Sequence, residues 1–450
     1  MSALEVAGRA RAHAGPDALA RVIRERSLLL RFAAGRATQA TAIDDSTVEL
    51  AVLRSGHVGR AMTNRTDEDG LAECARLARS GAEVAAVVGP GAHPGFAAAE
   101  PSAPLDAVDR PTAQLDPEVG GAALTDAFEA AAGHGVEVHG IWSAGARDEA
   151  VAGADISLES QGTDAYMKVI AVDPRSGRSG FAATAARGVA EMDARALVDE
   201  AAMSATRNGD AVELPSGQYP VVFAPQAVGL ICDLFGQVAL NGLAHAEGRG
   251  ALVGQLGRRI AAPAVNLADS PGYRLTLPRG FDAEGTPKRP RPLIQDGVAI
   301  GVAHDRRSGA LAGAESTGHA IVPGGHPDGP YPTNLVLAGG GAADVADLCA
   351  PIERGLYVTR LWYANVVRPK QGLITAVTRD GTFLIEDGAL TRPVRDLRMA
   401  DSVLGILARV QALTGRQQLV SEAHFYGRRV PYGVVCPAVR VSSVRFVAPA

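Results

Sequence analysis

Several features that would assign this chain to a class are missing. The 450 residues contain no run of 18 apolar residues, so no membrane-spanning helix is predicted. The first residues, MSALEVAGRARAHAG, lack the apolar middle region of a signal peptide, and we expect the chain to stay in the cytoplasm. Only four cysteines are present, with no CxxC pair, which favours buried free thiols over a disulfide framework or a cysteine metal site.

Neither sign of charge dominates. There are 44 basic and 49 acidic side chains, a net charge of −5, so no general attraction to nucleic acid or to anionic lipid is expected. The one basic cluster, Lys288, Arg289 and Arg291, alternates with prolines, and we interpret it as a solvated loop. Aromatic residues make up only 4%, so small and aliphatic side chains must supply most of the packing.

Common catalytic motifs are also absent: there is no HExxH, no GxSxG and no GxxxxGK. Three glycines at 339–341 follow a strand-like run, but a third motif glycine and the later acidic residue of a dinucleotide site are missing. A plain strand-to-helix turn with Asp344 near the cap is therefore favoured. The histidines, among them His304, His319 and His424, show no ligand spacing and are expected to be ordinary surface or hydrogen-bonded residues.

Hydrophobic periodicity divides the chain near residue 212. The first part mixes helical patterns with a Val-rich alternating run that turns at Ser55-Gly56, and one helix is expected to be capped by Thr66 or Asp67. The second part is rich in strands, with hairpin signals at 295–297, 380–381 and 387–388 and helices predicted over 342–355 and 401–414. The sequence predicts an α+β protein with an N-terminal mixed α/β domain, 1–212, and a strand-rich domain, 213–450.

From residue 213 onwards the sequence resembles the TldD/TldE (PmbA) metallopeptidase family. The run ELPSGQYPVVFAPQAVG is similar to a junction in that family, where a short strand ends in Ala-Pro and leads directly into a helix. Further similarity lies in FDAEGTP followed by LIQDGV and ESTGHA, and in PTNLVL and ERGLYVTRLW. The resemblance implies that the second domain has the fold of this family.

The resemblance also implies where a metal site would lie. In the catalytic member, the helix after this strand carries HExxxH, with two zinc-binding histidines and a general-base glutamate; the corresponding residues here are Asp233, Leu234 and Val238. The third ligand is a cysteine before the segment that reads VPYGVVCPAVRV here, and its position holds Ala423. Leucine cannot accept a proton from water and valine cannot bind zinc, and we do not expect Cys436 to replace the lost ligand.

On local grounds the same helix is an ordinary core helix. Ile231, Leu234, Phe235 and Val238 fall at helical spacing and form one apolar stripe. The resemblance therefore implies a subunit that has kept the scaffold and filled the former metal face with packing. It would hold no cofactor itself, and a TldD-like partner bearing HExxxH would supply the zinc in a heterodimer.

The expected activity of such a pair is hydrolysis of an amide bond in a peptide or a small natural-product intermediate. Candidates for contact with substrate or partner are polar residues in Gly/Pro-rich turns of the resembling segments: Arg306, Ser316, Thr317, Thr333, Asn334 and Tyr357. For each of them singly, capping a turn or holding a loop is at least as well supported. Two alternatives stay open: a non-catalytic substrate-binding or chaperone-like subunit, and an independent hydrolase with another nucleophile.

Overall fold

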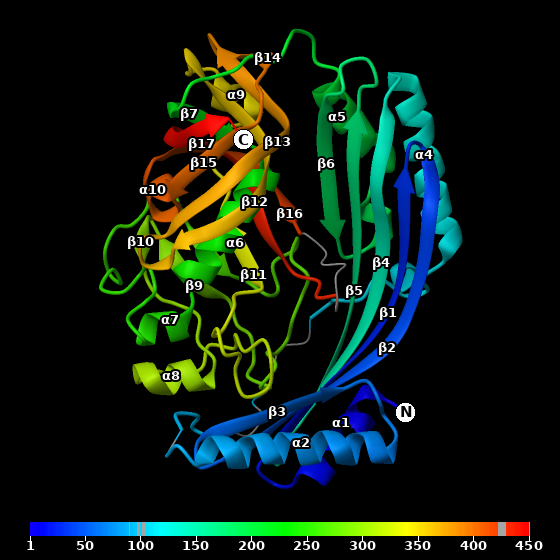
Figure 1. Ribbon diagram of the computed structural model, residues 1–450, viewed down its shortest axis with the longest axis vertical. Coiled ribbons are helices and arrows are strands. Elements are labelled where there is room, and N and C mark those ends of the chain that lie inside the picture. Colours follow the sequence, from blue (N-terminus) through cyan, green and yellow to red (C-terminus); the bar gives the residue numbers. More distant parts are fainter. Residues whose placement is uncertain (90, 97–99, 101–104, 422–428, 450) are drawn as a thin grey trace.

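A computed structural model describes residues 1–89, 91–96, 100, 105–421 and 429–449. Its strands form two sheets, one in each half of the chain (Figure 1). The last strand of the first sheet ends at Ala186 and the first strand of the second begins at Gly217. The predicted α+β class is confirmed.

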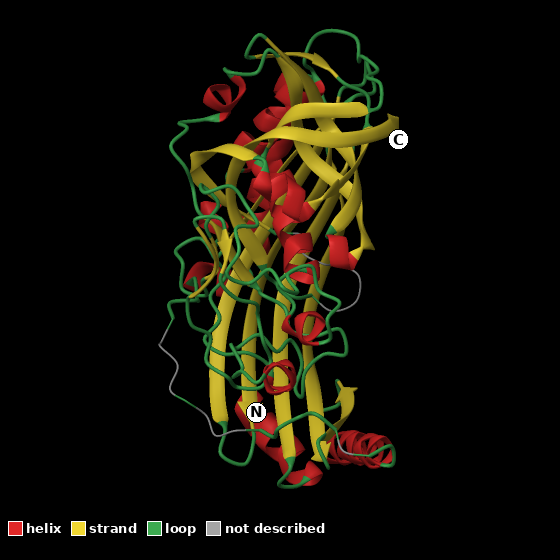
Figure 2. Cartoon of the chain, turned by 90° about the vertical axis from the view of Figure 1, so that its left-hand side faces the viewer, coloured by secondary structure: helices red, strands yellow, loops and turns green. Residues whose placement is uncertain are grey.

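The first sheet has six strands in the order β3-β2-β1-β4-β5-β6, and every neighbouring pair is antiparallel. Its strands are β1 (Ala18–Ala33), β2 (Arg36–Arg54), β3 (His57–Thr63), β4 (Glu137–Ala152), β5 (Ser157–Val172) and β6 (Ser179–Ala186). Four of them have 16 to 19 residues, so the sheet extends along the length of the molecule (Figure 2). The predicted turn between β2 and β3 is confirmed: Ser55 (φ 49°) and Gly56 (φ 75°) are both left-handed, as a tight hairpin turn needs.

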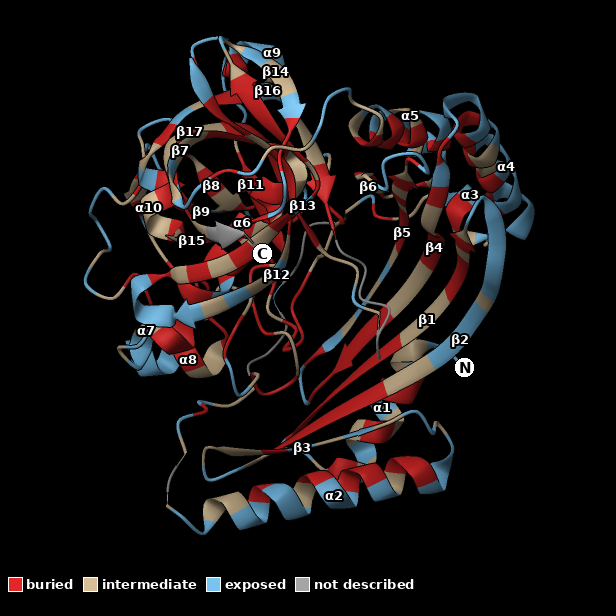
Figure 3. Cartoon of the chain, turned by 45° about the horizontal axis from the view of Figure 1, so that its top comes forward, coloured by how far each residue is buried: buried red, intermediate tan, exposed pale blue. Residues whose placement is uncertain are grey.

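Two pairs of helices pack on this sheet near its two ends (Figure 1). They are α1 (Ala3–Ala14) with α2 (Glu68–Ala86), and α4 (Pro117–His134) with α5 (Ala194–Ala205); α3 (Arg110–Ala113) is a short turn before α4. Asp67 caps α2 by accepting a hydrogen bond from the N–H of Gly70, so the second of the two predicted caps is the right one. The buried side of α2 faces the sheet and its other side is exposed (Figure 3).

The second sheet contains a closed ring of strands. β7 pairs with β12, β12 with β13, β13 with β15, β15 with β17, and β17 pairs again with β7. These strands are β7 (Gly217–Phe223), β12 (Arg354–Arg368), β13 (Leu373–Glu386), β15 (Leu397–Ser402) and β17 (Gly433–Pro449). Strands on the flanks are β8 (Leu267–Asp269), β9 (Arg291–Gln295), β10 (Val298–Ala299), β11 (Asn334–Leu337), β14 (Ala389–Pro393) and β16 (Val410–Val420).

Helices of this second part are mostly short: α6 (Pro225–Val238), α7 (Gly242–Ala246), α8 (Arg306–Ala312), α9 (Val345–Cys349) and α10 (Val403–Ala408). The predicted helix over 401–414 is wrong in its second half, because β16 begins at Val410 and pairs with β17. The predicted helix over 342–355 is reduced to α9, with Asp344 as its cap. No helix in the described ranges combines the length and the apolar character that crossing a membrane requires.

Two of the three predicted hairpin turns are present. Asp296 and Gly297 join β9 to β10, and Asp387 and Gly388 join β13 to β14, all with positive φ. Gly381, the third, lies inside β13, where the register with β12 shifts between Val358 and Arg360. A glycine in a strand-like sequence can mark either a hairpin turn or a bulge within one strand. Gly381 marks an irregularity within a continuous strand.

Candidate functional site

The helix α6 follows directly from β7. Pro225 is at its start, where a missing backbone N–H leaves no intrahelical hydrogen bond unmade. The predicted apolar stripe is confirmed, because Ile231, Leu234, Phe235 and Val238 are all buried in one hydrophobic cluster. The helix packs on β12 and β17, so the ring of strands fixes its position.

A cavity of about 720 Å³ lies beside the end of α6, between the two sheets. Residues of β1, β2 and β4 form one wall: Arg21, Ile23, Glu49, Arg147 and Glu149. Among the residues of the opposite wall are Val238, Asn241, Lys288, His319, Tyr331 and Thr333. This volume is in the range of small-molecule and peptide sites, and the cavity is therefore the candidate functional site.

The positions that correspond to the zinc ligands and the general base do not fit a metal site. Leu234 and Val238 have no donor atom, and both side chains are buried. The carboxylate of Asp233 accepts a hydrogen bond from the hydroxyl of Tyr331, and Gln237 Nε2 lies 3.3 Å from its other oxygen. Among the residues that the structure describes, no three His, Cys, Asp or Glu side chains are grouped so as to hold a metal ion. Ala423 and His424 lie outside the described residues.

Cys436 is part of the core of this region. It is fully buried, and its thiol donates a hydrogen bond to the carbonyl of Pro225 at 3.3 Å. Burial, together with the neighbouring Cys232, raises the pKa of the Cys436 thiol well above its usual value. A protonated, buried thiol is a packing group and not a ready metal ligand. All four cysteines are free and buried.

Of the six predicted contact residues, only Thr333 lines the cavity. Ser316 and Thr317 both donate to the carbonyl of His304 and so hold a loop. Asn334 is buried and binds the carbonyl of Leu277 with its side chain. These three residues hold loops in place, which was the alternative to contact with substrate or partner.

Arg306 and Tyr357 also lie away from the cavity. Arg306 is the first residue of α8, and its backbone N–H donates to Glu284. Tyr357 lies on β12 and stacks on Phe383, with 6.3 Å between the ring centroids. Burial and the nearby Glu200 raise the pKa of the Tyr357 hydroxyl, so it stays neutral, and its ring packs against a hydrophobic cluster.

A buried charge cluster forms the wall of the cavity on the first sheet, and the sequence analysis did not identify it. Arg21 Nε donates to Glu149 Oε1 at 2.7 Å, and Arg21 Nη1 donates to Glu49 Oε2 at 3.1 Å and to the carbonyl of Ile321 at 3.0 Å. Burial alone would raise the pKa of Glu149, but the charges of Arg21, Arg147 and Arg279 outweigh it and lower the pKa to about 2. The cluster therefore stays charged and joins the first sheet to the second half of the chain.

The opposite wall contains a second buried pair. Lys288 Nζ lies 3.0 Å from Asp269 Oδ1, with the two side chains 2% and 0% exposed. The interpretation of Lys288 as part of a solvated loop is therefore wrong, while Arg289 and Arg291 are exposed as expected. Burial opposes ionisation of Asp269, but Lys288 and then His319 hold the pKa of that carboxyl well below its usual value.

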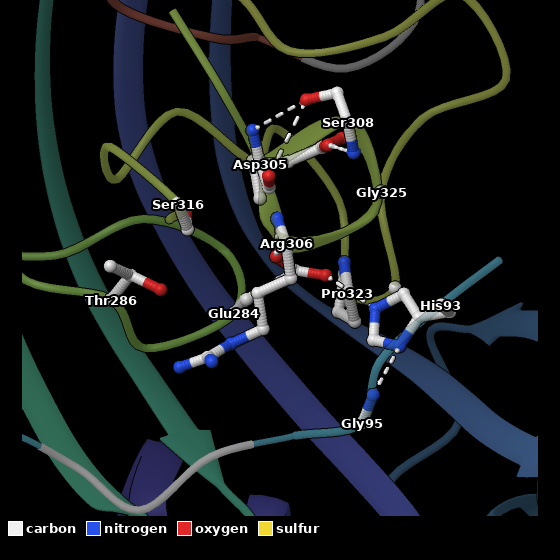
Figure 4. A network of polar contacts seen from close by, with 12 residues as sticks. His93, Gly95, Glu284, Thr286, Asp305, Arg306, Ser308, Ser316, Pro323 and Gly325 are labelled. Carbon is white, nitrogen blue, oxygen red and sulfur yellow. Dashed lines mark hydrogen bonds and ion pairs between the residues drawn. The ribbon is translucent and has the colours of Figure 1, made fainter. Parts of the chain in front are cut away.

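A third buried polar group joins the loop after α2 to the turn at 282–286 (Figure 4). His93 Nε2 lies 3.0 Å from Glu284 Oε1, and neither side chain is more than 1% exposed. His93 Nδ1 accepts a hydrogen bond from the N–H of Gly95, so its Nε2 carries the proton that is donated to Glu284. The second oxygen of Glu284 accepts from the backbone N–H of Arg306. This group stabilises the lower edge of the second half of the chain against the first.

Comparison with known proteins agrees with this architecture. The family model described as PmbA/TldA metallopeptidase C-terminal domain matches residues 216–448, and the one described as PmbA/TldA metallopeptidase domain 1 matches residues 18–82. The chain is 31% identical over 222 residues to metalloprotease slr0863 of Synechocystis (47% of this chain, 46% of that protein). It is 26% identical over 265 residues to a metalloprotease TldD homolog of Haemophilus influenzae (57% of this chain, 54% of that protein).

These alignments thus span about half the length of the curated relatives. The crystal structure of TldE from Thermococcus kodakarensis superposes with a TM-score of 0.81, 20% identity and 96% coverage of each chain. At that identity the superposition shows a shared fold. Because a family model matches more than half of the residues, the chain belongs to the PmbA/TldD metallopeptidase family.

Proposed function

We propose that this chain is the subunit without metal of a two-subunit metallopeptidase or amidase. In this proposal a TldD-like homologue that carries HExxxH supplies the zinc and the general base, and this chain completes the substrate cleft. The observation that carries the proposal is the composition of α6, where Leu234 and Val238 are buried apolar residues and Asp233 is bound to Tyr331. A subunit whose partner supplies the zinc ligands can keep the fold of the family and lose the ligand side chains itself.

The role of this chain in the pair is to hold and position the substrate. The cavity supports that role, because it joins polar residues, such as Tyr331 and Thr333, to apolar ones, such as Val238. The substrate class is a peptide or a small amide, and the place of action is the cytoplasm. The same cavity also supports the alternative of a substrate-binding or chaperone-like subunit with no part in the chemistry.

The test compares the isolated chain, the isolated partner and their mixture. We expect co-purification as a heterodimer with about one zinc ion per pair, none of it in the isolated chain, and amide cleavage only by the mixture. Elemental analysis and cleavage of a peptide library are the two measurements. Stoichiometric zinc in the isolated chain would contradict the proposal. Equal turnover by the partner alone would replace it with the alternative of a binding subunit.

A further inference from the structure

Among the residues that the structure describes, the charge cluster on the cavity wall has more cations than anions. Three guanidinium groups surround Glu149: Arg21 at 2.6 Å, Arg147 at 3.5 Å and Arg279 at 3.8 Å. Glu49, which is bound to Arg21, is the second carboxylate of the cluster. All five side chains are at most 12% exposed, so water cannot compensate the remaining positive charge effectively.

Arg147 is the least satisfied member of this cluster. Within the described part of the chain its guanidinium makes no hydrogen bond, and its single ion pair joins Nε to Glu149 Oε2 at 3.5 Å. The side chain is 12% exposed and lines the cavity. A guanidinium has five N–H donors in a planar arrangement that matches the two oxygens of a carboxylate.

Other charged residues that the structure describes near the cavity have partners of their own. Asp269 compensates Lys288, and Asp164 binds Arg429. At the rim Arg249 Nε lies 2.6 Å from Glu247. The oxygens of Asp282 accept hydrogen bonds from two backbone N–H groups of its own turn and from that of Ala320, so backbone donors already hold this carboxylate.

Apolar side chains lie next to the cluster. Ile23 comes from the same face of β1, and Phe281, Val322 and Val238 come from the other side of the cavity. A ligand that fits both features has one carboxylate and an apolar or aromatic body. The carboxylate of the ligand would balance the excess positive charge of the cluster, and its apolar or aromatic part would cover the apolar wall.

We propose that this cavity binds a carboxylate-bearing ligand, with Arg147 as its principal counter-ion and the apolar wall as the site for an adjacent hydrophobic side chain. The carboxylate is either the free C-terminus of a peptide or an acidic side chain. Binding is a property of this chain alone. That the ligand is a substrate rests on the proposed function.

The test uses isothermal titration calorimetry on the full chain with three dipeptides: N-acetyl-Ala-Phe, its C-terminal amide, and N-acetyl-Asp-Phe amide. We expect the free acid to bind at least about tenfold more tightly than the amide, the range of a charge-assisted, bidentate pair. Tight binding of the Asp-containing amide would identify an acidic side chain as the source of the carboxylate. Equal binding of all three ligands by the wild-type chain, or no binding, would overturn the inference.

Variants locate the site. Arg147→Gln should reduce the affinity for the free acid to that for the amide and leave the affinity for the amide unchanged, and Arg147→Lys should restore part of the preference. Arg175→Gln is the control, because Arg175 is 82% exposed at the turn between β5 and β6. A preference for the free acid that survives Arg147→Gln in a folded variant would refute the assignment. These results do not depend on zinc or turnover, so a failure here leaves the proposed function standing.

Discussion

Replacement of Arg21 by Met tests the view that the buried cluster holds the two halves of the chain together. The substitution keeps an unbranched stem but is shorter and has no charge, so it leaves Glu49 and Glu149 buried without their ion pairs to Arg21. Removing one partner of a buried ion pair costs about 3–5 kcal/mol. Arg147 and Arg279 remain near Glu149, so we expect a loss of about 3 kcal/mol in the free energy of unfolding.

Thermal unfolding followed by circular dichroism measures this loss. For a cooperative unit of this length, about 3 kcal/mol corresponds to a decrease in Tm of roughly 3 °C. The matched control is Arg24→Met on the same strand, which breaks an ion pair whose side chains are 42% and 58% exposed. The control should change Tm very little, because exposed pairs contribute little.

The loss should also depend on pH. The pKa of Glu149 is about 2 in the folded protein, below the value of about 4.3 in an unfolded chain. Its contribution to stability is therefore complete above pH 4.3 and is lost as the pH falls towards 2. In the variant the pKa rises, so the deficit should be full at pH 7 and smaller at pH 4. Equal Tm changes for the two variants, or a deficit that grows in acid, would refute the reasoning.

Three further predictions concern other parts of the chain. The double variant Asp233→His, Val238→His should show no zinc-dependent turnover without a partner. In denaturant titration, Val238→His should lower the free energy of unfolding by roughly 1–3 kcal/mol if the buried imidazole makes no hydrogen bond. His93→Ala should lower stability by about 1–3 kcal/mol because its glutamate partner is buried, and His93→Gln, which can still donate, should lower it less. Gly59→Ala should destabilise the protein because a Cβ there overlaps the backbone of α2, whereas Gly8→Ala, with open space around it inside α1, should raise the free energy of unfolding by about 0.5–1 kcal/mol. Unchanged stability of the Gly59 variant would contradict the packing of α2 on β3.

Local patterns were sufficient for the features that depend on neighbours in sequence. The stripe on α6 and the turn at Ser55-Gly56 each follow from a few adjacent residues and were predicted correctly, and Asp67 was one of the two predicted caps of α2. The region 401–414 shows the limit of such reasoning. Its residues have helical spacing, but pairing with the distant β17 makes Val410 onwards a strand, because tertiary contacts override a local preference.

The charge clusters of the cavity could not be predicted in this way. Arg21 and Glu149 are 128 residues apart, and only the pairing of β1 with β4 brings them together. The sequence around Lys288, with its prolines and arginines, predicts a solvated side chain. Its partner Asp269, and His319, which also lies beside Asp269, come from separate segments of the chain. The one available signal was a charged residue within an apolar strand pattern, as at Arg21 in ALARVI and Glu49 in VELAVL.

The ring of strands has a consequence for biosynthesis. β7 (Gly217–Phe223) is synthesised before the other strands of the ring, whereas β17 (Gly433–Pro449), which pairs with β7 and with β15, is synthesised after them. Until β17 has emerged, the ring stays open and the apolar stripe of α6 lacks one of the strands against which it packs. Until then the second half leaves part of its apolar core uncovered, a state in which nascent chains are prone to aggregate. A chain that stops before β17 would be a substrate for proteolysis and not a partially active subunit.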